Sequence, residues 1–296
     1  MIDILITIVL ALIMFSIGLS LKTVDFRHLF IAPRVLSYGL FLQLMVLPAL
    51  AFTVVGLADL PPAFSIGFLI LSACPGGLSS NFISFLLRAN TALAVSLTIC
   101  NSTVAMFSVP FIINLALEIY QPGTGATHLP MVPTALRLFA IVLLPVLAGM
   151  GARHLFPRRS EVIQPHLRRL AMVLLGLVFT LKLLAPASHG GSAFTLTEVG
   201  QILPVALLIN LLALSTGRIG GALFGLDTNN QITLGVEIGI QNTSLAFLIA
   251  GSFLGNDEAI KPALIYAMFT FFTALGYGLL LKPRMYRRIR KDLTGW

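Results

Sequence analysis

Glu237 is the residue whose type and position most constrain the chemistry of this chain. It is one of eleven acidic residues and the only one in the middle of a segment apolar enough to cross a membrane. A carboxylate there is energetically costly, so it usually faces a cavity or binds a cation. The polar residues Gln241 and Asn242 follow within about one helical turn. The pattern favours a cation site, and the alternative is a structural carboxylate hydrogen-bonded to neighbouring helices.

The residues after Glu237 also predict a break in the helix. Gly239 lowers the cost of leaving regular helical geometry. Unwinding there would free backbone carbonyls, among them those of Ile238 and Ile240. Hard cations such as sodium prefer oxygen ligands of this kind. No histidine or cysteine cluster of the metal-ligand type accompanies these residues, which argues against zinc or copper.

The stretch Cys74–Gly77, with sequence CPGG, predicts a second helix break. Proline removes a backbone donor and clashes with the preceding turn, while the glycines permit a non-helical path. A simple proline kink is the alternative. The small polar residues Ser79–Asn81 follow directly and favour a new helix N-terminus, whose positive dipole end suits an anion or a substrate.

Further polar residues lie in other apolar segments. Ala94, Thr98 and Asn101 share one helical face by their spacing. Thr98 could equally hydrogen-bond back to its own helix. Gln43 could be a ligand or a contact between helices, and Arg137 is expected at the membrane interface with its charge in water.

Composition explains why these polar residues stand out. Of 296 residues, 57% are hydrophobic and only 10% are charged, and the mean hydropathy is +0.96. Soluble domains carry roughly 25% charged residues. The net charge of +8 comes from short basic clusters between apolar runs, with no nucleic-acid-binding signature. The composition therefore predicts an all-α integral membrane protein in contact with lipid and excludes a nucleic-acid partner.

Apolar runs of about 20 residues, the length that crosses a bilayer, predict nine transmembrane helices. The predicted segments are 2–21, 35–57, 62–87, 91–118, 131–154, 170–187, 199–224, 229–253 and 260–281.

The lysines and arginines near the segment ends predict the orientation of the chain. With nine segments most of them gather on one side, which the positive-inside rule identifies as cytoplasmic. The opposite side has Lys261 in a loop, with Arg137 and Lys182 near the ends of their segments. We expect a multi-pass protein of the cell inner (plasma) membrane with its N-terminus outside and a basic cytoplasmic tail over 284–296. The residues on the basic side are Lys22, Arg27, Arg34, Arg88, Arg153, Arg158, Arg159, Arg168, Arg169 and those of the tail.

The two predicted breaks occupy corresponding places in the two halves of the chain. One lies in segment 62–87 and the other in segment 229–253. We therefore expect segments one to four and six to nine to form an inverted repeat joined by the fifth. Paired polar interruptions of this kind indicate a transporter binding site at the bilayer midplane.

These motifs together resemble the bile acid:sodium symporter family across almost the whole chain. The breaks at Cys74–Gly77 and Glu237–Asn242 are the most specific in combination. The other matching residues are Met14–Leu19, Asp25-Phe26, Gln43 ahead of Leu47-Pro48, and Ser80-Asn81.

The resemblance implies two crossed broken helices within a core of approximately 35–130 and 188–283. It also implies a panel of approximately 1–34 and 131–187 that moves against the core. Sodium would occupy two sites that share Glu237. The first would use Ser80, Asn81, Thr98 and Glu237, and the second Gln43, Glu237, Gln241 and the carbonyls of Ile238 and Ile240.

The substrate residues implied by the resemblance lie at the helix crossing and in the last segment: Gly77, Leu78, Ser79, Asn242, Thr243 and Thr270. The chain departs from the family pattern at three of its positions. Ala94 stands where bacterial relatives often have a serine ligand of the first sodium site. Leu78 replaces a small polar residue, and Thr270-Phe271 stands where some relatives have a His-Asn pair.

We expect sodium-coupled symport of an organic anion, either bile-acid-like or a smaller carboxylate such as a keto or hydroxy acid, by alternating access. The predicted partners are sodium, the anion and the bilayer. Alternatives are a proton-coupled or uncoupled organic-anion carrier, or an ion channel in which Glu237 titrates. An intramembrane enzyme would need a nucleophile–base pair or a zinc motif, and all five histidines lie near or outside segment ends.

Overall fold

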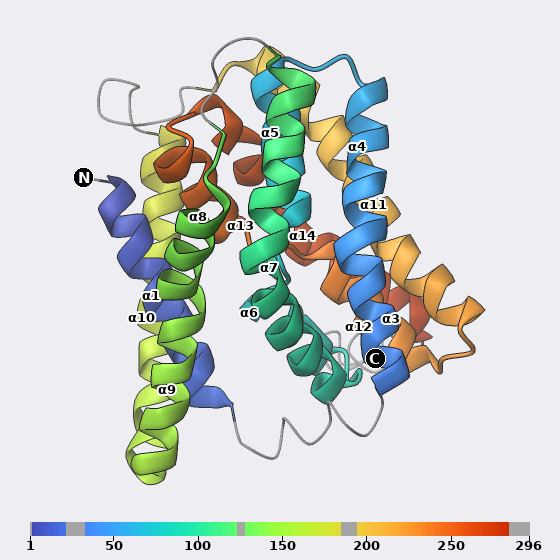
Figure 1. Cartoon of the computed structure of the whole chain (residues 1–296). Coiled ribbons are helices and arrows are strands. Elements are labelled where there is room, and N and C mark those ends of the chain that lie inside the picture. The colour runs from blue at the N-terminus through green and yellow to red at the C-terminus, as the bar shows by residue number, and fades with distance from the viewer. Residues whose placement is uncertain (1, 22–32, 123–127, 185–193, 284–296) are drawn as a thin grey trace.

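The computed structural model describes residues 2–21, 33–122, 128–184 and 194–283. Every regular element in these ranges is a helix (Figure 1). The predicted motif Asp25-Phe26 and the basic tail 284–296 lie outside the described residues. The helices are α1 (Ile2–Ser20), α3 (Pro33–Phe41), η2 (Leu42–Val46), α4 (Leu47–Leu57), α5 (Pro62–Ala73), α6 (Leu78–Leu86), α7 (Thr91–Tyr120), α8 (Met131–Leu138), η3 (Phe139–Leu143), α9 (Leu144–Leu155), α10 (Pro157–Leu184), α11 (Leu196–Leu223), α12 (Thr228–Gly239), α13 (Thr243–Phe247), η5 (Leu248–Phe253), η6 (Glu258–Ile260) and α14 (Lys261–Leu281).

Seven helical stretches in the described residues are long and apolar enough to cross a membrane. The two remaining predicted segments have shorter helices: α1 is apolar over Leu5–Ser20, and segment 62–87 is divided into α5 and α6. The count of nine crossings stays a prediction. The seven stretches are Pro33–Leu57, Thr91–Tyr120, Met131–Leu155, Pro157–Lys182, Leu196–Leu223, Thr228–Phe253 and Glu258–Leu281.

One boundary prediction is wrong. Segment 170–187 was expected to begin at residue 170, but α10 begins at Pro157. The first half of α10 carries several arginines, which lower the hydropathy on which that boundary depended, whereas proline suits the first position of a helix. Arg168 and Arg169 therefore lie inside a helix, not in a connecting loop.

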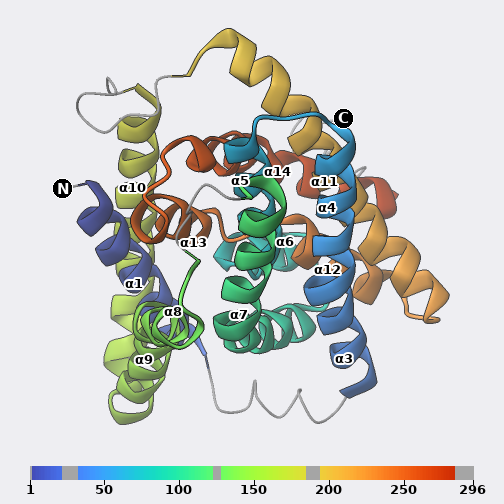
Figure 2. The same ribbon diagram turned by 45° about the horizontal axis from the view of Figure 1, so that its top comes forward.

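The helices form two groups that lie side by side in both views (Figures 1 and 2). In the first group α1 packs against α9 and α10. In the second group α11 packs on α12 and α14, and α5 on α7 and α4. The stretch Thr228–Phe253 is the most enclosed, since 94% of its most apolar window is buried, against 11% for Pro157–Lys182. The helix that carries Glu237 is thus central to its group.

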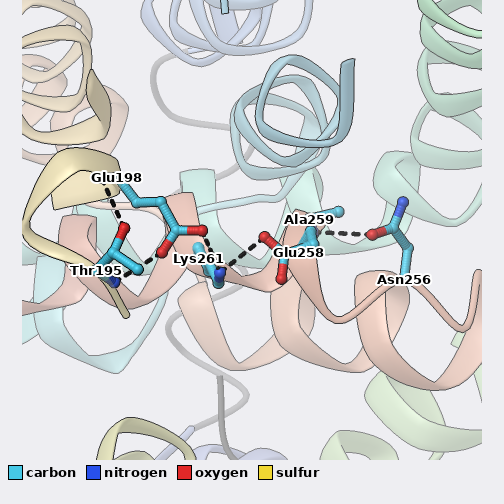
Figure 3. Close-up of polar contacts among 6 residues, drawn as sticks. All are labelled: Thr195, Glu198, Asn256, Glu258, Ala259 and Lys261. Atoms are coloured by element: carbon cyan, nitrogen blue, oxygen red, sulfur yellow. Dashed lines mark hydrogen bonds and ion pairs between the residues drawn. The ribbon is translucent and has the colours of Figure 1, made fainter. Parts of the chain in front are cut away.

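The ends of α11 and α14 are joined by a buried lysine (Figure 3). Lys261 Nζ lies 2.6 Å from Glu198 Oε1 and 2.7 Å from Glu258 Oε2, and its side chain is only 3% exposed. Glu198 also forms a capping box with Thr195 at the start of α11. A buried ammonium needs such compensation, and these contacts fix the first turn of α11 against the first turn of α14.

The contact between α1 and α9 depends on two glycines. A Cβ atom on Gly18 would lie 2.1 Å from the carbonyl oxygen of Val146, and one on Gly149 would lie 2.3 Å from that of Phe15. Small residues let helix backbones approach closely in a membrane. The two glycines therefore set the distance between α1 and α9.

We expect Gly149→Leu to destabilise the protein by about 2 kcal/mol, because overpacking a close contact forces the backbones apart. Gly151→Leu is the matched control on the same helix, since a Cβ there would meet nothing within 4 Å. Thermal denaturation of the purified variants in detergent measures the difference. Equal denaturation temperatures would show that the contact does not limit stability.

Candidate functional site

The two predicted helix breaks are present, and they meet. The first separates α5 from α6 at Cys74–Gly77, and the second separates α12 from α13 at Ile240–Asn242. The backbone nitrogen of Asn242 donates a hydrogen bond to the carbonyl oxygen of Pro75 at 2.9 Å. Two segments far apart in the sequence are therefore joined where neither is helical.

Extended backbone produces both breaks. Cys74, Gly77 and Ile240 all have extended dihedral angles. Asn242 then begins α13, and its side-chain oxygen accepts a hydrogen bond from the backbone nitrogen of Leu245 at 3.0 Å. The local sequence thus ends one helix and begins the next, as the side-chain cap of an N-terminus requires.

The carbonyl of Gly239, freed by the second break, is held by residues that the sequence analysis did not single out. It accepts hydrogen bonds from Asn210 Nδ2 at 2.8 Å and from the Tyr266 hydroxyl at 2.7 Å. Thr273 Oγ1 in turn donates to Asn210 Oδ1 at 2.6 Å. Asn210 is a polar residue within the apolar run 199–224, and this is the sequence signal from which a role for it in holding the break could have been predicted.

Glu237 is 1% exposed, and its carboxylate lies beside the first break. Its Oε1 accepts a hydrogen bond from Thr98 Oγ1 at 2.6 Å, and Asn81 Nδ2 donates to the same threonine oxygen at 3.1 Å. A Cβ atom on Gly76 would lie 2.5 Å from Glu237 Oε1 and 3.2 Å from Ser80 Oγ. The structure therefore brings together all four residues predicted for the first sodium site.

Gln43 and Gln241, predicted for the second sodium site, also contact each other. Gln43 Nε2 donates to Gln241 Oε1 at 3.0 Å and to the carbonyl oxygen of Cys74 at 3.2 Å. Gln241 Nε2 donates to the carbonyl oxygen of Ile238. Gln43 lies in the π-helical turn η2, a distortion that is frequent at functional sites.

Three buried oxygens in this region have no hydrogen-bond partner among the described residues: Glu237 Oε2, Asn81 Oδ1 and Gln43 Oε1. Buried polar atoms are normally hydrogen-bonded, so such exceptions call for a reason. All three are oxygen atoms of the kind that coordinate hard cations, which have no strong directional preference. The residues present fit a sodium ion as cargo.

Ala94 and Asn101 flank Thr98 on α7. Ala94 is fully buried, and its carbonyl oxygen, 3.0 Å from Thr98 Oγ1, is the alternative acceptor for the single hydroxyl proton of Thr98. Asn101 is also fully buried, and neither polar atom of its amide group has a partner in the part of the chain that the structure describes. The amide one turn beyond Thr98 therefore offers an oxygen where the side chain of Ala94 offers none.

A cavity of about 220 Å³ lies next to the crossing. Four of the predicted substrate residues line it, namely Gly77, Ser79, Asn242 and Thr243. Leu78 begins α6 directly beside them. Thr270 is buried on α14 and does not line this cavity, whereas its neighbour Phe271 does.

The fold and the site define a helical, multi-span membrane protein in which two broken helices meet beside a buried carboxylate. The chain belongs to the sodium bile acid symporter family, whose model matches residues 7–187.

Three relatives illustrate the range of this similarity. The probable sodium/metabolite cotransporter BASS2, chloroplastic, of Oryza sativa subsp. japonica is 30% identical over 260 residues, 88% of this chain and 59% of the relative. The uncharacterized sodium-dependent transporter YocS of Bacillus subtilis is 26% identical over 290 residues, 98% and 85% respectively. The human ileal sodium/bile acid cotransporter is 26% identical over 265 residues, 90% and 72%. The chain thus spans only about three fifths of the rice protein.

We expect Gly76→Ala to destabilise the protein by about 2 kcal/mol, because a Cβ at this position collides with the Glu237 carboxylate. Gly77→Ala is the matched control: it adds the same methyl group one residue further on, where the nearest atoms are 4.0 Å away. Thermal denaturation compares the two variants. If Gly77→Ala is as damaging as Gly76→Ala, the close approach to Glu237 is not the cause.

Proposed function

We propose that this protein is a sodium-coupled symporter of an organic anion that works by alternating access. The observation that carries the proposal is the set of unpartnered buried oxygens of Glu237, Asn81 and Gln43 at the helix crossing. The names of the relatives, which describe sodium-dependent transporters and cotransporters, agree with it.

The first sodium ion is bound by Ser80, Asn81, Thr98 and Glu237. Support comes from the hydrogen bonds that already connect Asn81 to Thr98 and Thr98 to Glu237. The carboxylate supplies the negative charge, and burial of that charge without a cation is costly. Sodium therefore stabilises the arrangement in which α6, α7 and α12 are held together.

The second sodium ion is bound by Gln43, Glu237, Gln241 and the carbonyls of Ile238 and Ile240. Support comes from the contact between the two glutamines and from the bond of Gln241 to the Ile238 carbonyl. These residues belong to the second break and to η2. Binding here couples the shape of the second break to the cation.

The organic anion binds at the crossing, in the cavity lined by Gly77, Ser79, Asn242 and Thr243. The N-terminus of α6 lies at this cavity, and its positive dipole end favours a negative charge. Leu78 and Thr270 complete the proposed substrate residues. Because the anion and the cations occupy the same pair of breaks, each favours the geometry that the other needs.

In alternating access, a panel moves against a core. The panel is formed by residues 1–34 and 131–187, which include α1 and α8–α10, and the core by residues 35–130 and 188–283. Support for this division comes from packing: α1 contacts α9 and α10 extensively, and it meets the core at α13 and η5. The inverted repeat relates the two breaks within the core. Chemistry on a substrate is not needed for this activity, so the protein is not expected to be an enzyme.

We expect Glu237→Gln to abolish stabilisation of the purified protein by sodium, because it removes the charge that neutralises the cation. Thr98→Ala should weaken sodium binding by a smaller step. Ala94→Ser should strengthen it by about 1 kcal/mol, since it adds one oxygen contact on the same face. Sodium titration followed by thermal denaturation measures all three.

Glu118→Gln is the matched control, because it is the same substitution as Glu237→Gln but at an exposed glutamate near the end of α7. If Ala94→Ser has no effect while Asn101→Ala weakens binding, Asn101 already supplies the missing ligand. If Glu237→Gln keeps the sodium dependence of the wild type, sodium coupling is wrong. A proton-coupled or uncoupled carrier then replaces it, and sodium uptake into proteoliposomes without substrate would indicate a channel.

The protein is proposed to be multi-pass in the inner (plasma) membrane, with its N-terminus outside and the tail 284–296 in the cytoplasm. The asymmetry of lysine and arginine supports this orientation. A reporter fused after Trp296 should be cytoplasmic, and one fused before Met1 should be outside. Both reporters on one side would contradict nine crossings.

A further inference from the structure

Arg168 lies on α10 at the boundary between the two helix groups. It lines the cavity of about 220 Å³ at the crossing and also a second cavity of about 300 Å³. Its guanidinium carbon lies 5.2 Å from the centre of the Phe82 ring, which belongs to α6 and lines both cavities as well. This one side chain thus faces the proposed substrate site from the group opposite the breaks.

Arg168 is half-buried, and it has no ion-pair partner in the described part of the chain. Its Nε is buried and has no hydrogen-bond partner. None of the ion pairs among the described residues includes it, and the acid on the same helix, Glu161, pairs with Arg153. The buried Nε–H group is removed from water without an acceptor, which is costly, and contact with the Phe82 ring supplies only part of the compensation.

The lining of the two cavities indicates what kind of ligand could supply an acceptor to Arg168. Among the described residues that line them, Arg168 is the only charged side chain, and none is an acid. The lining of the first cavity also includes the neutral polar residues Ser79, Asn242 and Thr243 and the apolar residues Met14 and Met172. The arrangement suits a ligand with one anionic end, further hydrogen-bonding groups and a short carbon chain.

We propose that Arg168 binds the carboxylate of the transported substrate, and that this substrate is a small organic acid. A planar guanidinium binds a carboxylate through two parallel hydrogen bonds, a geometry that lysine cannot reproduce. The volume of about 220 Å³ lies below the range of roughly 300–1,000 Å³ for pockets that enclose drug-sized ligands. Taken alone, the cavity at the crossing therefore fits a short-chain acid, whereas a sterol-sized bile acid would have to extend into the second cavity, of about 300 Å³, which shares Arg168 and Phe82. This inference rests on the proposed function and names the substrate class at the same site.

The consequence for transport is that the substrate bridges the two groups. Its carboxylate contacts α10, while its other polar atoms contact the breaks of α5–α6 and α12–α13. A ligand that touches both sides of a moving boundary can favour one arrangement over another, as alternating access requires.

The test uses the purified full chain in sodium buffer and thermal denaturation against pyruvate, 2-oxobutyrate, 2-oxopentanoate and taurocholate. Each oxo acid is paired with its uncharged amide. At least one oxo acid should stabilise the wild type, whereas its amide and taurocholate should not. Arg168→Gln should weaken binding of that acid roughly 10- to 100-fold, the scale of a lost hydrogen bond to a charged group. The affinity of Arg168→Lys for that acid should lie between those of the wild type and of Arg168→Gln.

Arg169→Gln is the matched control, since Arg169 is the exposed neighbour on the same helix. It should bind the acid as the wild type does, and stabilisation by sodium alone should be unchanged in every variant. If Arg168→Gln does not fold, Arg168→Lys alone decides the matter. Unchanged affinity for the acid in a folded Arg168 variant, binding of the amide as tight as that of the acid, or equal loss in Arg169→Gln overturns the inference.

Failure of the proposed function gives a different result. If sodium does not stabilise the wild type, the proposed sodium coupling is wrong, whether or not the Arg168 variants bind the acid more weakly. A wild type that responds to sodium but to none of the oxo acids would overturn the inference about the substrate and leave the cation sites standing.

Discussion

A carboxylate enclosed in an apolar helical protein must be compensated, and much of the site follows from how Glu237 meets this requirement. Its Oε1 has one close donor, Thr98, and its Oε2 has none. The first break passes so near that only a glycine fits at position 76. Three features therefore meet at the Glu237 carboxylate: the proline and glycines of the first break, Thr98 on α7 and the central burial of α12. Keeping this carboxylate charged away from water requires a compensating positive charge, which the proposed cation would supply.

The breaks cost backbone hydrogen bonds, and the structure replaces them with specific partners. The Gly239 carbonyl takes donors from Asn210 and Tyr266, and the Asn242 nitrogen uses the Pro75 carbonyl. An unpaired backbone group in an apolar interior is expensive. These partners therefore hold two irregular segments in one defined geometry, which is what a cation site built from carbonyls and side-chain oxygens needs. They also explain why polar residues on α11 and α14, outside the proposed ligands, belong to the same arrangement.

The group of α1, α9 and α10 differs in character from the helices around Glu237. Its internal contacts are close, as the paired glycines of α1 and α9 require. Its boundary with the crossing instead contains the two cavities and Arg168, whose Nε has no hydrogen-bond partner among the described residues. A tightly packed group beside a boundary that contains cavities can move as one body without losing its own contacts. The two kinds of packing are consistent with the proposed division into panel and core.

The sequence by itself determined the helical membrane class, the family resemblance and both breaks, because hydropathy, proline and glycine act locally. It also identified Glu237, since one acid within an apolar run needs no structure to be noticed. Hydropathy could not determine where α10 begins, because the arginines of an amphipathic helix resemble a loop in a hydropathy profile. It could not find Asn210 and Tyr266, whose role depends on which carbonyl they reach across the fold. For the same reason Arg168 was assigned to a basic cluster at a segment end. Only the tertiary structure shows it at the cavities beside Phe82, because burial and the absence of a partner are properties of packed neighbours and not of sequence order.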